Sequence, residues 1–575
     1  MQSLDVATQD RVRDVYGYVP DSLAKGLSAL LATAVDRDTA SGNPALWDHR
    51  DVVLITYADQ VRDDDTAPIE AQRRFLVDHG LNRLIRCVHF LPFCPSTSDD
   101  GFSVADYLQI DPDFGDWDDV ARTGADFDLM FDLVLNHSSQ EHEWFRKFLQ
   151  GDPAYADYYA TADPADDLSM VVRPRALPLL TSFEAADGIR HVWTTFSADQ
   201  VDLNYANPDV MLAMIETFVQ YARHGARIIR LDAIAFLWKE IGTSCMHLPQ
   251  THAAVCLMRH ILDLVVPGTL VLTETNVPHV ENLSYFGRGD DEAHMVYQFS
   301  LPPLLLDAVH TGDTSILREW MMTLSTPSAE TTFFNFTSSH DGIGMRPAEG
   351  LLPQDRLDQL VDRTRQHGGR VSMRSHADGR ETPYELNITY LDAVADRHRV
   401  PPPDHSRRFL ATQAIMLSMP GMPAIYFHSL VGSPNDEAAV VETGINRRIN
   451  RHKYDRAELE ATLSGPDSLQ RRVFDGYKRL LEVRLNCPAF HPSARHDVLD
   501  LPTDGLLGFL RQMDGELPVT VVANLSDEIR EIEQIDWPEP FRYDLLAEES
   551  VLSDAPLTMR PYQVRWLINR NERTG

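Results

Sequence analysis

Three short segments of the sequence place a carboxylate at the end of an expected strand. Each segment lies next to an apolar run, such as Ile228-Ile229 before the first. Carboxylates that meet in one cleft can supply a nucleophile and a proton donor to a glycosidic bond. The acidic residues Asp232, Glu274 and Asp341 are therefore candidates for sugar-cleaving chemistry. The segments are Arg230-Leu231-Asp232-Ala233, Leu272-Thr273-Glu274-Thr275 and Ser339-His340-Asp341-Gly342.

Eight apolar runs, rich in β-branched or aromatic residues, are candidates for the strands that position these carboxylates. Helical stretches separate most of the runs. One of these carries Val210, Met214 and Phe218 at the i, i+4, i+8 spacing of a single helix face. Eight strand-helix units predict an α/β fold of the (β/α)8 TIM barrel type. The predicted strands are 51–57, 87–91, 129–134, 227–231, 270–273, 295–299, 332–336 and 424–427.

Two connections are too long for a simple barrel unit and predict inserted subdomains after strands 3 and 7. Both follow strand ends that carry the candidate chemistry, so we expect them over the active face. After about residue 490 short alternating segments predict a C-terminal antiparallel β domain. The predicted division is an N-terminal helical extension 1–48, barrel parts 49–136, 209–342 and 405–489, an inserted subdomain 137–208, a loop-rich inserted subdomain 343–404 and the C-terminal domain 490–575.

Composition and charge exclude several classes of partner. The 575 residues include 86 acidic and 52 basic side chains, which gives a formal net charge of −34. This charge argues against nucleic acid or an anionic membrane as a partner, and an anionic substrate would need a local basic cluster. The five scattered cysteines form no Cys-x-x-Cys pair, and the N-terminus has no signal-peptide pattern. No apolar run is long enough for a membrane span, so we expect a cytoplasmic protein.

Four motifs resemble, in order, those of the α-amylase superfamily. They are Asp132-Leu133-Val134-Leu135-Asn136-His137, Arg230-Leu231-Asp232-Ala233, Glu274 and His340-Asp341. Further segments are similar to the sucrose phosphorylase subfamily, among them Ile55-Thr56-Tyr57-Ala58-Asp59, His89-Phe90-Leu91-Pro92-Phe93 and Leu301-Pro302-Pro303-Leu304. Within that subfamily, Thr275-Asn276-Val277-Pro278-His279 and Asp290-Asp291-Glu292-Ala293-His294 resemble most the glucosylglycerate phosphorylases.

The resemblance implies a retaining mechanism, in which two carboxylates act at one anomeric carbon. Asp232 would be the nucleophile, and Glu274 would be the acid/base. Asp341 would stay ionised and stabilise the positive charge of the transition state. Arg230 shares a strand face with Asp232 and would keep that carboxylate ionised. For each carboxylate taken alone, a helix cap or a surface ion pair is the alternative.

The resemblance also implies a pocket for a single glucose unit. Asp100, His137, His340 and Arg451 match residues that hold the terminal glucose, and Phe102 matches an aromatic platform under the ring. A pocket of this kind predicts transfer of single glucosyl units rather than cleavage inside a polymer. The alternatives are that the two histidines are structural and that Phe102 belongs to the core.

Acceptor recognition is predicted from two loops and one histidine. Arg175 and Tyr384 match residues of the two acceptor loops of the subfamily, and His279 is a further candidate. The loop from Arg370 to Arg380 is basic, and Thr382 stands where the sucrose-type pattern has an acidic residue. These departures favour an anionic acceptor over fructose. Incidental solvated arginines and a structural histidine are the alternatives.

Together these features predict a retaining glycoside phosphorylase that acts on an α-glucoside and inorganic phosphate. The favoured substrate is 2-O-α-glucosylglycerate, which would give α-glucose 1-phosphate and D-glycerate through a covalent β-glucosyl-enzyme. We expect no cofactor and no metal, and a homodimer is a candidate assembly. The alternatives are a sucrose, sucrose 6'-phosphate or glucosylglycerol phosphorylase, an α-glucoside hydrolase or transglucosidase, and a non-catalytic binding protein on the same fold.

Overall fold

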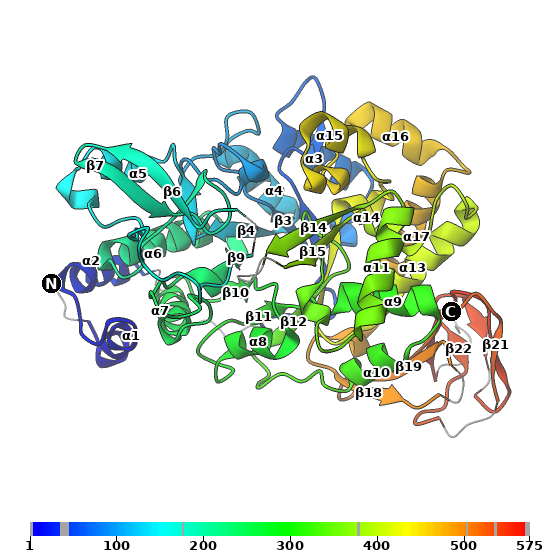
Figure 1. The fold of residues 1–575 in the computed structure, drawn as a ribbon. Coiled ribbons are helices and arrows are strands. Elements are labelled where there is room, and N and C mark those ends of the chain that lie inside the picture. The colour runs from blue at the N-terminus through cyan, green and yellow to red at the C-terminus, as the bar shows by residue number, and fades with distance from the viewer. Residues whose placement is uncertain are drawn as a thin grey trace.

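The structure is a computed structural model that describes residues 4–34, 45–174, 177–375, 380–501, 504–533, 537–551 and 553–569. Within these residues, eight parallel strands close into a barrel (Figure 1). They follow one another around the barrel in chain order, and the last pairs with the first. The predicted TIM barrel and its strands are confirmed. The strands are β1 (Val53–Thr56), β3 (Cys87–Phe90), β4 (Asp128–Val134), β9 (Ala226–Asp232), β10 (Leu270–Thr273), β11 (Met295–Tyr297), β12 (Thr332–Asn335) and β16 (Met422–Tyr426).

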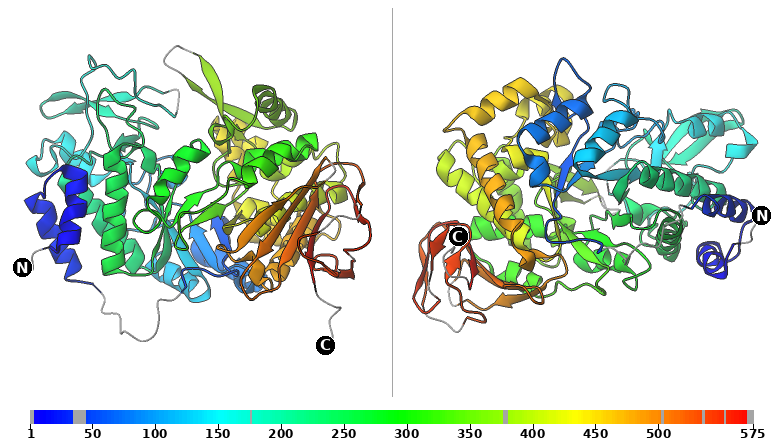
Figure 2. Two further views of the ribbon diagram at one scale, coloured as in Figure 1. Left: turned by 90° about the horizontal axis from the view of Figure 1, so that it is seen from below. Right: turned by 180° about the vertical axis from the view of Figure 1, so that it is seen from behind.

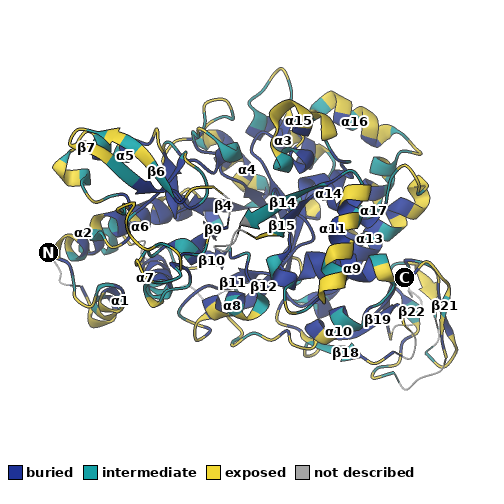
Figure 3. Ribbon diagram, in the orientation of Figure 1, coloured by how far each residue is buried: buried dark blue, intermediate teal, exposed yellow. Residues whose placement is uncertain are grey.

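Helices cover the outside of the barrel and bury one face against it. In α6 (Pro208–Arg223) the predicted face carries Val210, Met214 and Phe218, and all three are fully buried. Figure 3 shows the same division, with buried strands inside and exposed helix faces outside. The other helices between or after the strands are α3 (Pro68–Asp78), α4 (Trp117–Asp126), α7 (Pro249–Val265), α8 (His279–Leu283), α9 (Leu301–Thr311), α10 (Ser315–Met321), α13 (Pro402–Ser418), α14 (Phe427–Val431), α15 (Glu437–Thr443), α16 (Arg456–Ser464) and α17 (Leu469–Arg484).

The segment after the third barrel strand builds a small layer of its own. It contains the antiparallel pair of β5 (His137–Ser139) and β8 (Gln200–Asp202). In the chain, β5 comes directly after β4. The hairpin of β6 (Leu180–Ala185) and β7 (Gly188–Trp193) and the helix α5 (Glu143–Leu149) complete it. His137 thus stands where the barrel strand passes into the insert.

The segment after the seventh barrel strand was expected to be rich in loops, and this expectation is wrong. It contains α11 (Gln354–Gln366), α12 (Tyr390–Val394) and a three-stranded sheet of β13 (Ile343–Gly344), β15 (Glu381–Asn387) and β14 (Arg370–Ser375). The pairing of β14 with β15 shifts at a bulge between Ser372 and Met373. Gly342 allows the close approach of β15, because an added Cβ would lie 2.5 Å from the carbonyl oxygen of Leu386.

The two ends of the chain pack at opposite ends of the barrel domain (Figures 1 and 2). The helices α1 (Val6–Tyr16) and α2 (Asp21–Leu31) pack on α7 and α6, respectively.

The predicted C-terminal antiparallel sheet is present, and the domain boundaries given above stay predictions. No helix in the described parts of the chain is both long and apolar enough to cross a bilayer. The sheet order is β18 (Arg495–Leu499), β19 (Leu506–Gln512), β20 (Val519–Asn524), β25 (Val564–Ile568), β22 (Tyr543–Asp544) and β23 (Glu549–Ser550), and the remaining pairs are β21 (Arg530–Ile532) with β24 (Leu557–Met559) and β2 (Val61–Arg62) with β17 (Tyr454–Asp455).

Candidate active site

The guanidinium of Arg230 joins three carboxylates at the end of β9. Its Nη1 lies 2.7 Å from Oδ1 of Asp232 and also bonds to Asp132 on β4, and its Nη2 lies 3.9 Å from Oε2 of Glu274. The barrel register explains this arrangement, because Asp132 and Arg230 are direct partners of the β4–β9 pair. Asp232 follows two residues later, so its side chain lies on the same strand face. The structure therefore brings Arg230, Asp232 and Glu274 together.

Glu274 is held by the turn that follows Asp232. The backbone N–H of Ala233 donates a hydrogen bond of 3.0 Å to Oε2 of Glu274. Ala233 has a φ of 52°, a left-handed conformation that is unfavourable for a residue with a side chain. Backbone strain of this kind costs about 1–3 kcal/mol and is concentrated at functional sites. The strained turn thus aligns one donor with the carboxylate on the neighbouring strand end.

Burial and neighbouring charges shift the pKa values of both carboxylates. Burial raises the pKa of Asp232 well above its ordinary value, and the negative charge of Glu274 raises it further against the pull of Arg230. Burial also raises the pKa of Glu274. Arg230 is bonded directly to Asp232 and stands farther from Glu274, so it stabilises the anion of Asp232 more strongly. The two carboxylates therefore titrate as a coupled pair in which Arg230 favours the anion of Asp232.

Asp341 is fixed by an arginine that was not predicted from the sequence. Nη1 of Arg447 lies 2.7 Å from Oδ1 of Asp341, and its other nitrogens contact Glu385 at 3.0 and 3.1 Å. Glu385 lies on β15 and is fully buried. Arg447 therefore connects the segment that follows β12 to the second insert. The basic pair Arg447-Arg448, just before the predicted Arg451, is the sequence feature that could have indicated a role for Arg447 in the site.

The predicted glucose-binding side chains form one wall of the site. The ring of Phe102 stacks on His340, with 4.7 Å between ring centroids and 8° between the planes. Nε2 of His137 lies 2.9 Å from the carbonyl oxygen of Phe102. Burial lowers the pKa of His137 to about 4 and that of His340 well below its ordinary value, so both imidazoles are neutral near pH 7. Neutral rings can accept as well as donate hydrogen bonds to sugar hydroxyls.

Arg451 and Asp100 support this wall from behind. Arg451 is fully buried, donates to the carbonyl oxygen of His340 at 2.9 Å, and contacts Asp100 at 2.7 Å and Asp99 at 3.3 Å. Asp100 also pairs with Arg448 at 2.9 Å. Asp99 and Asp100 both have positive φ values near 50°, which is another sign of backbone strain at this site.

A pocket lies over these groups and combines most of the predicted residues with several that the sequence did not single out. Asp232, Glu274, Asp341, Phe102 and both neutral histidines line it. Arg230, Asp100 and Arg451 are not among the lining residues and hold the pocket walls instead. Within the described residues, no group of three or more histidines, cysteines or acidic residues could hold a metal ion. The lining residues that were missed are Asp99, Phe196, Gln200, Ala233, Asn276 and Arg447.

Of the three residues predicted to bind the acceptor, only Tyr384 is found among the described residues that line the pocket. Tyr384 on β15 lines the pocket, and burial raises the pKa of its hydroxyl to about 12. His279 is not among the lining residues, because its ring packs toward Trp320 and Phe333 at centroid distances of 6.0 and 6.3 Å. The geometry thus favours the structural alternative for His279. Arg175 lies outside the described residues.

Comparisons with known proteins agree with this geometry. Residues 84–342 match the family model described as the catalytic domain of alpha amylase. A glucosylglycerate phosphorylase of Spirochaeta thermophila is 49% identical over 528 residues, which cover 90% of this chain and 89% of the relative. A glucosylglycerate phosphorylase of Escherichia coli is 45% identical over 522 residues, covering 91% and 92%. The crystal structure of sucrose 6F-phosphate phosphorylase from Thermoanaerobacter thermosaccharolyticum superposes with a TM-score of 0.72 at 25% identity and covers 84% of this chain and 96% of that one.

Proposed function

Since the chain belongs to the glucosylglycerate phosphorylase family of the α-amylase superfamily, we propose that it cleaves 2-O-α-glucosylglycerate with inorganic phosphate. The products are α-glucose 1-phosphate and D-glycerate. The observation that carries this proposal is the shared contact of Asp232 and Glu274 with one guanidinium, that of Arg230. This contact places both carboxylates at one small pocket, as the short separation in retaining enzymes requires.

In the first half of the reaction, Asp232 attacks the anomeric carbon and Glu274 protonates the departing oxygen. The C–O bond to glycerate breaks as the bond from Asp232 to the anomeric carbon forms, and the proton of Glu274 leaves with the glycerate hydroxyl. The direct contact with Arg230 stabilises the anion of Asp232, and burial raises the pKa of Glu274 and so favours its acid form, as this step needs. Asp341, held by Arg447, lies where a carboxylate can stabilise the oxocarbenium-like transition state.

In the second half, phosphate replaces glycerate and attacks the glucosyl ester. Glu274, now a carboxylate, accepts the proton of the incoming hydrogen phosphate, and Asp232 is released as an anion. Two inversions at the anomeric carbon restore the α configuration.

An anionic acceptor needs a cation near the pocket, and Arg346 is our candidate for it. The N–H of Met345 bonds to the carbonyl oxygen of Tyr384 at 3.0 Å, so Arg346 follows directly after a contact with a pocket residue. Its nearest carboxylate, on Glu281, lies 3.8 Å away. Burial and then the charge of Arg374 lower the pKa of Arg346. A bound carboxylate or phosphate would offset this repulsion, which supports a role in acceptor binding.

The proposed function is tested by two assays on the purified protein. Cleavage of glucosylglycerate is measured with and without inorganic phosphate, and we expect α-glucose 1-phosphate to form in a strictly phosphate-dependent reaction. Equal turnover without phosphate would identify a hydrolase instead. In the reverse direction, α-glucose 1-phosphate is offered with glycerate, fructose, fructose 6-phosphate and glycerol. Glycerate should be the best acceptor, and a preference for fructose would contradict the proposal.

Two further properties belong to the same proposal. The five cysteines are free and four of them are buried, which supports a location in the reducing cytoplasm. A homodimer stays a prediction. Size-exclusion chromatography with light scattering tests it by measuring the molar mass in solution.

A further inference from the structure

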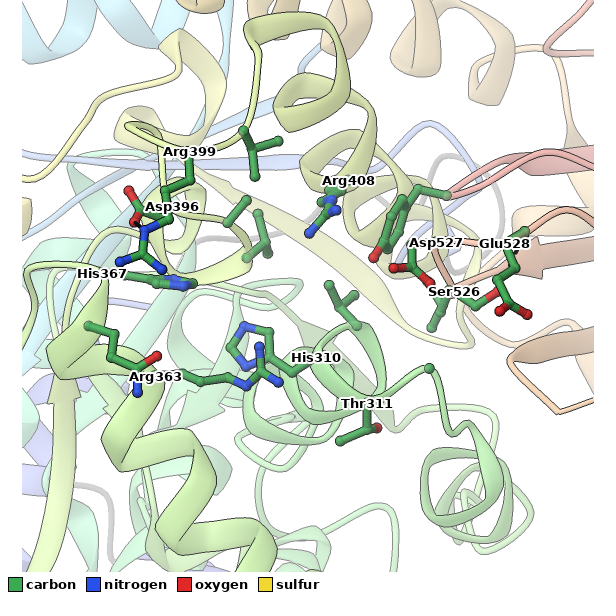
Figure 4. A pocket seen from close by; sticks show the side chains of 18 of the residues that line it. His310, Thr311, Arg363, His367, Asp396, Arg399, Arg408, Ser526, Asp527 and Glu528 are labelled. Atoms are coloured by element: carbon green, nitrogen blue, oxygen red, sulfur yellow. Dashed lines mark hydrogen bonds and ion pairs between the residues drawn. The ribbon is translucent and has the colours of Figure 1, made fainter.

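A second cavity lies between the barrel domain and the C-terminal domain, away from the candidate active site (Figure 4). Its volume is about 600 Å³, which is within the range of small-molecule sites. The walls come from the ends of α9 and α11, the segment 394–400, the helix α13 and the loop 525–530. None of the residues proposed for catalysis or for glucose binding lines it.

Two of the arginines that line this cavity lack a carboxylate partner. Arg399 pairs with Asp396 at 3.1 Å, and Arg530 pairs with Glu528 at 3.1 Å. By contrast, Arg363 and Arg408 form no ion pair with any acidic residue in the described parts of the chain. Both are half-buried, and Figure 4 shows them among the side chains around the cavity.

The contacts of Arg408 show that its charge is only partly compensated. Its guanidinium lies 4.5 Å from the ring centroid of Tyr562, a cation–π contact. Its Nε is buried and has no hydrogen-bond partner within the described residues. The C-terminal dipole of α11 stabilises Arg363 only weakly. Among the described residues, Asp527 also lines the cavity but forms no ion pair with either arginine. Two half-buried arginines without an ion-pair partner can bind an anion between the domains, even in a protein with a net charge of −34.

His310 adds an acceptor atom to these donors. Its Nε2 lies 2.9 Å from the carbonyl oxygen of Ala393, so this nitrogen carries the proton. Its Nδ1 is then an acceptor, and it is buried without a partner within the described residues. The charges of Arg363 and Arg408 both act on this ring and oppose its protonation. An oxyanion that also carries a hydroxyl satisfies both needs, because its oxygens accept from arginine and its hydroxyl donates to Nδ1.

We propose that this cavity is a second binding site for inorganic phosphate, formed by Arg363, Arg408 and His310. Hydrogen phosphate has the acceptor oxygens and the single hydroxyl that these three side chains require. Sulfate has the same shape and charge but no hydroxyl at neutral pH. The site is therefore expected to prefer phosphate over sulfate by about tenfold, the effect of one unmatched buried hydrogen bond.

The experiment is a calorimetric titration of the full chain with inorganic phosphate, with the number of bound ions as the readout. The wild-type protein should bind one more phosphate than the Arg363→Gln/Arg408→Gln double variant. The matched control is Arg365→Gln/Arg407→Gln. These two arginines are exposed sequence neighbours of Arg363 and Arg408, and they pair with Asp362 and Asp404. The control should bind phosphate like the wild type.

Each outcome bears on the proposal. Equal numbers of phosphate ions bound to the wild type and the double variant would overturn it, and so would equal affinity of the extra site for phosphate and sulfate. If the double variant does not fold, crystals of the wild type soaked in tungstate give the second measurement. Anomalous density next to Arg363 and Arg408 supports the site, and density confined to the active site overturns it. Because the readout is stoichiometry rather than turnover, its failure would leave the proposed function untouched.

Discussion

Replacing Glu274 by Gln should separate proton transfer from the formation of the glucosyl ester. Gln retains an oxygen that can accept the 3.0 Å hydrogen bond from Ala233, so we expect the fold and the position of Asp232 to be preserved. The variant cannot protonate the leaving oxygen, and general acid catalysis contributes about 10²–10⁴-fold. Turnover of glucosylglycerate should fall by that factor. Formation of the glucosyl-enzyme from α-glucosyl fluoride, whose leaving group needs no proton, should fall less than about tenfold.

The pH profile makes this prediction sharper. Two carboxylates about 5.5 Å apart repel by about 3 kcal/mol at an effective dielectric constant of about 20, which separates their two ionisations by roughly 2 pH units. In the wild type, kcat/KM should rise as Asp232 ionises and fall as Glu274 loses its proton. The Gln variant should keep the acidic limb with α-glucosyl fluoride and lose the basic limb. A basic limb that survives in the variant, or full activity on glucosylglycerate, would refute the assignment.

Further variants test other parts of the account. Arg447→Gln removes the counter-charge of buried Glu385 and should lower the free energy of unfolding by about 3–5 kcal/mol. Urea denaturation measures it, and a loss below about 1 kcal/mol would contradict the structural role. Arg346→Gln should raise the KM for glycerate in synthesis and leave hydrolysis of α-glucosyl fluoride nearly unchanged; a parallel loss in both assays would remove Arg346 from acceptor binding. Burial lowers the pKa of His142 to about 4, so the unfolded chain takes up this proton at higher pH than the folded one. Stability is then lost as the pH falls below about 6.5, by about 2 kcal/mol at pH 5. His142→Asn, which keeps an acceptor at the N-terminus of α5, should show less acid destabilisation by that amount, and an unchanged pH dependence would count against it.

The barrel could be predicted from the sequence because its strands are buried on both faces. Such strands form short, almost continuous apolar runs, as Leu270–Thr273 does, and the helices between them keep a clear face. The second insert could not be predicted in the same way. Its strand β15 contains Pro383, a residue that is unfavourable inside a strand, and its pairing with β14 has a bulge. The pairing of β15 with the two-residue strand β13, rather than a local pattern, completes this sheet.

The candidate site was predictable to the extent that its residues stand in short motifs. Asp232, Glu274 and Asp341 each follow a barrel strand, and the barrel brings them together. Arg447 belongs to a short helical turn far along the chain, and its role depends on a contact with Glu385 that no local pattern reveals. His279 shows the converse, since it is close to Glu274 in sequence but is not among the residues that line the pocket.

The central claim is that Asp232 forms a covalent bond with glucose. The most direct measurement is mass spectrometry of the Glu274→Gln variant after reaction with α-glucosyl fluoride in the absence of phosphate, because this variant should form the ester faster than it resolves it. We predict a mass increase of one glucosyl unit on the peptide that contains Asp232, and its loss when azide, a nucleophile that needs no base, is added. An unlabelled protein, or a label on any other peptide, would contradict the account.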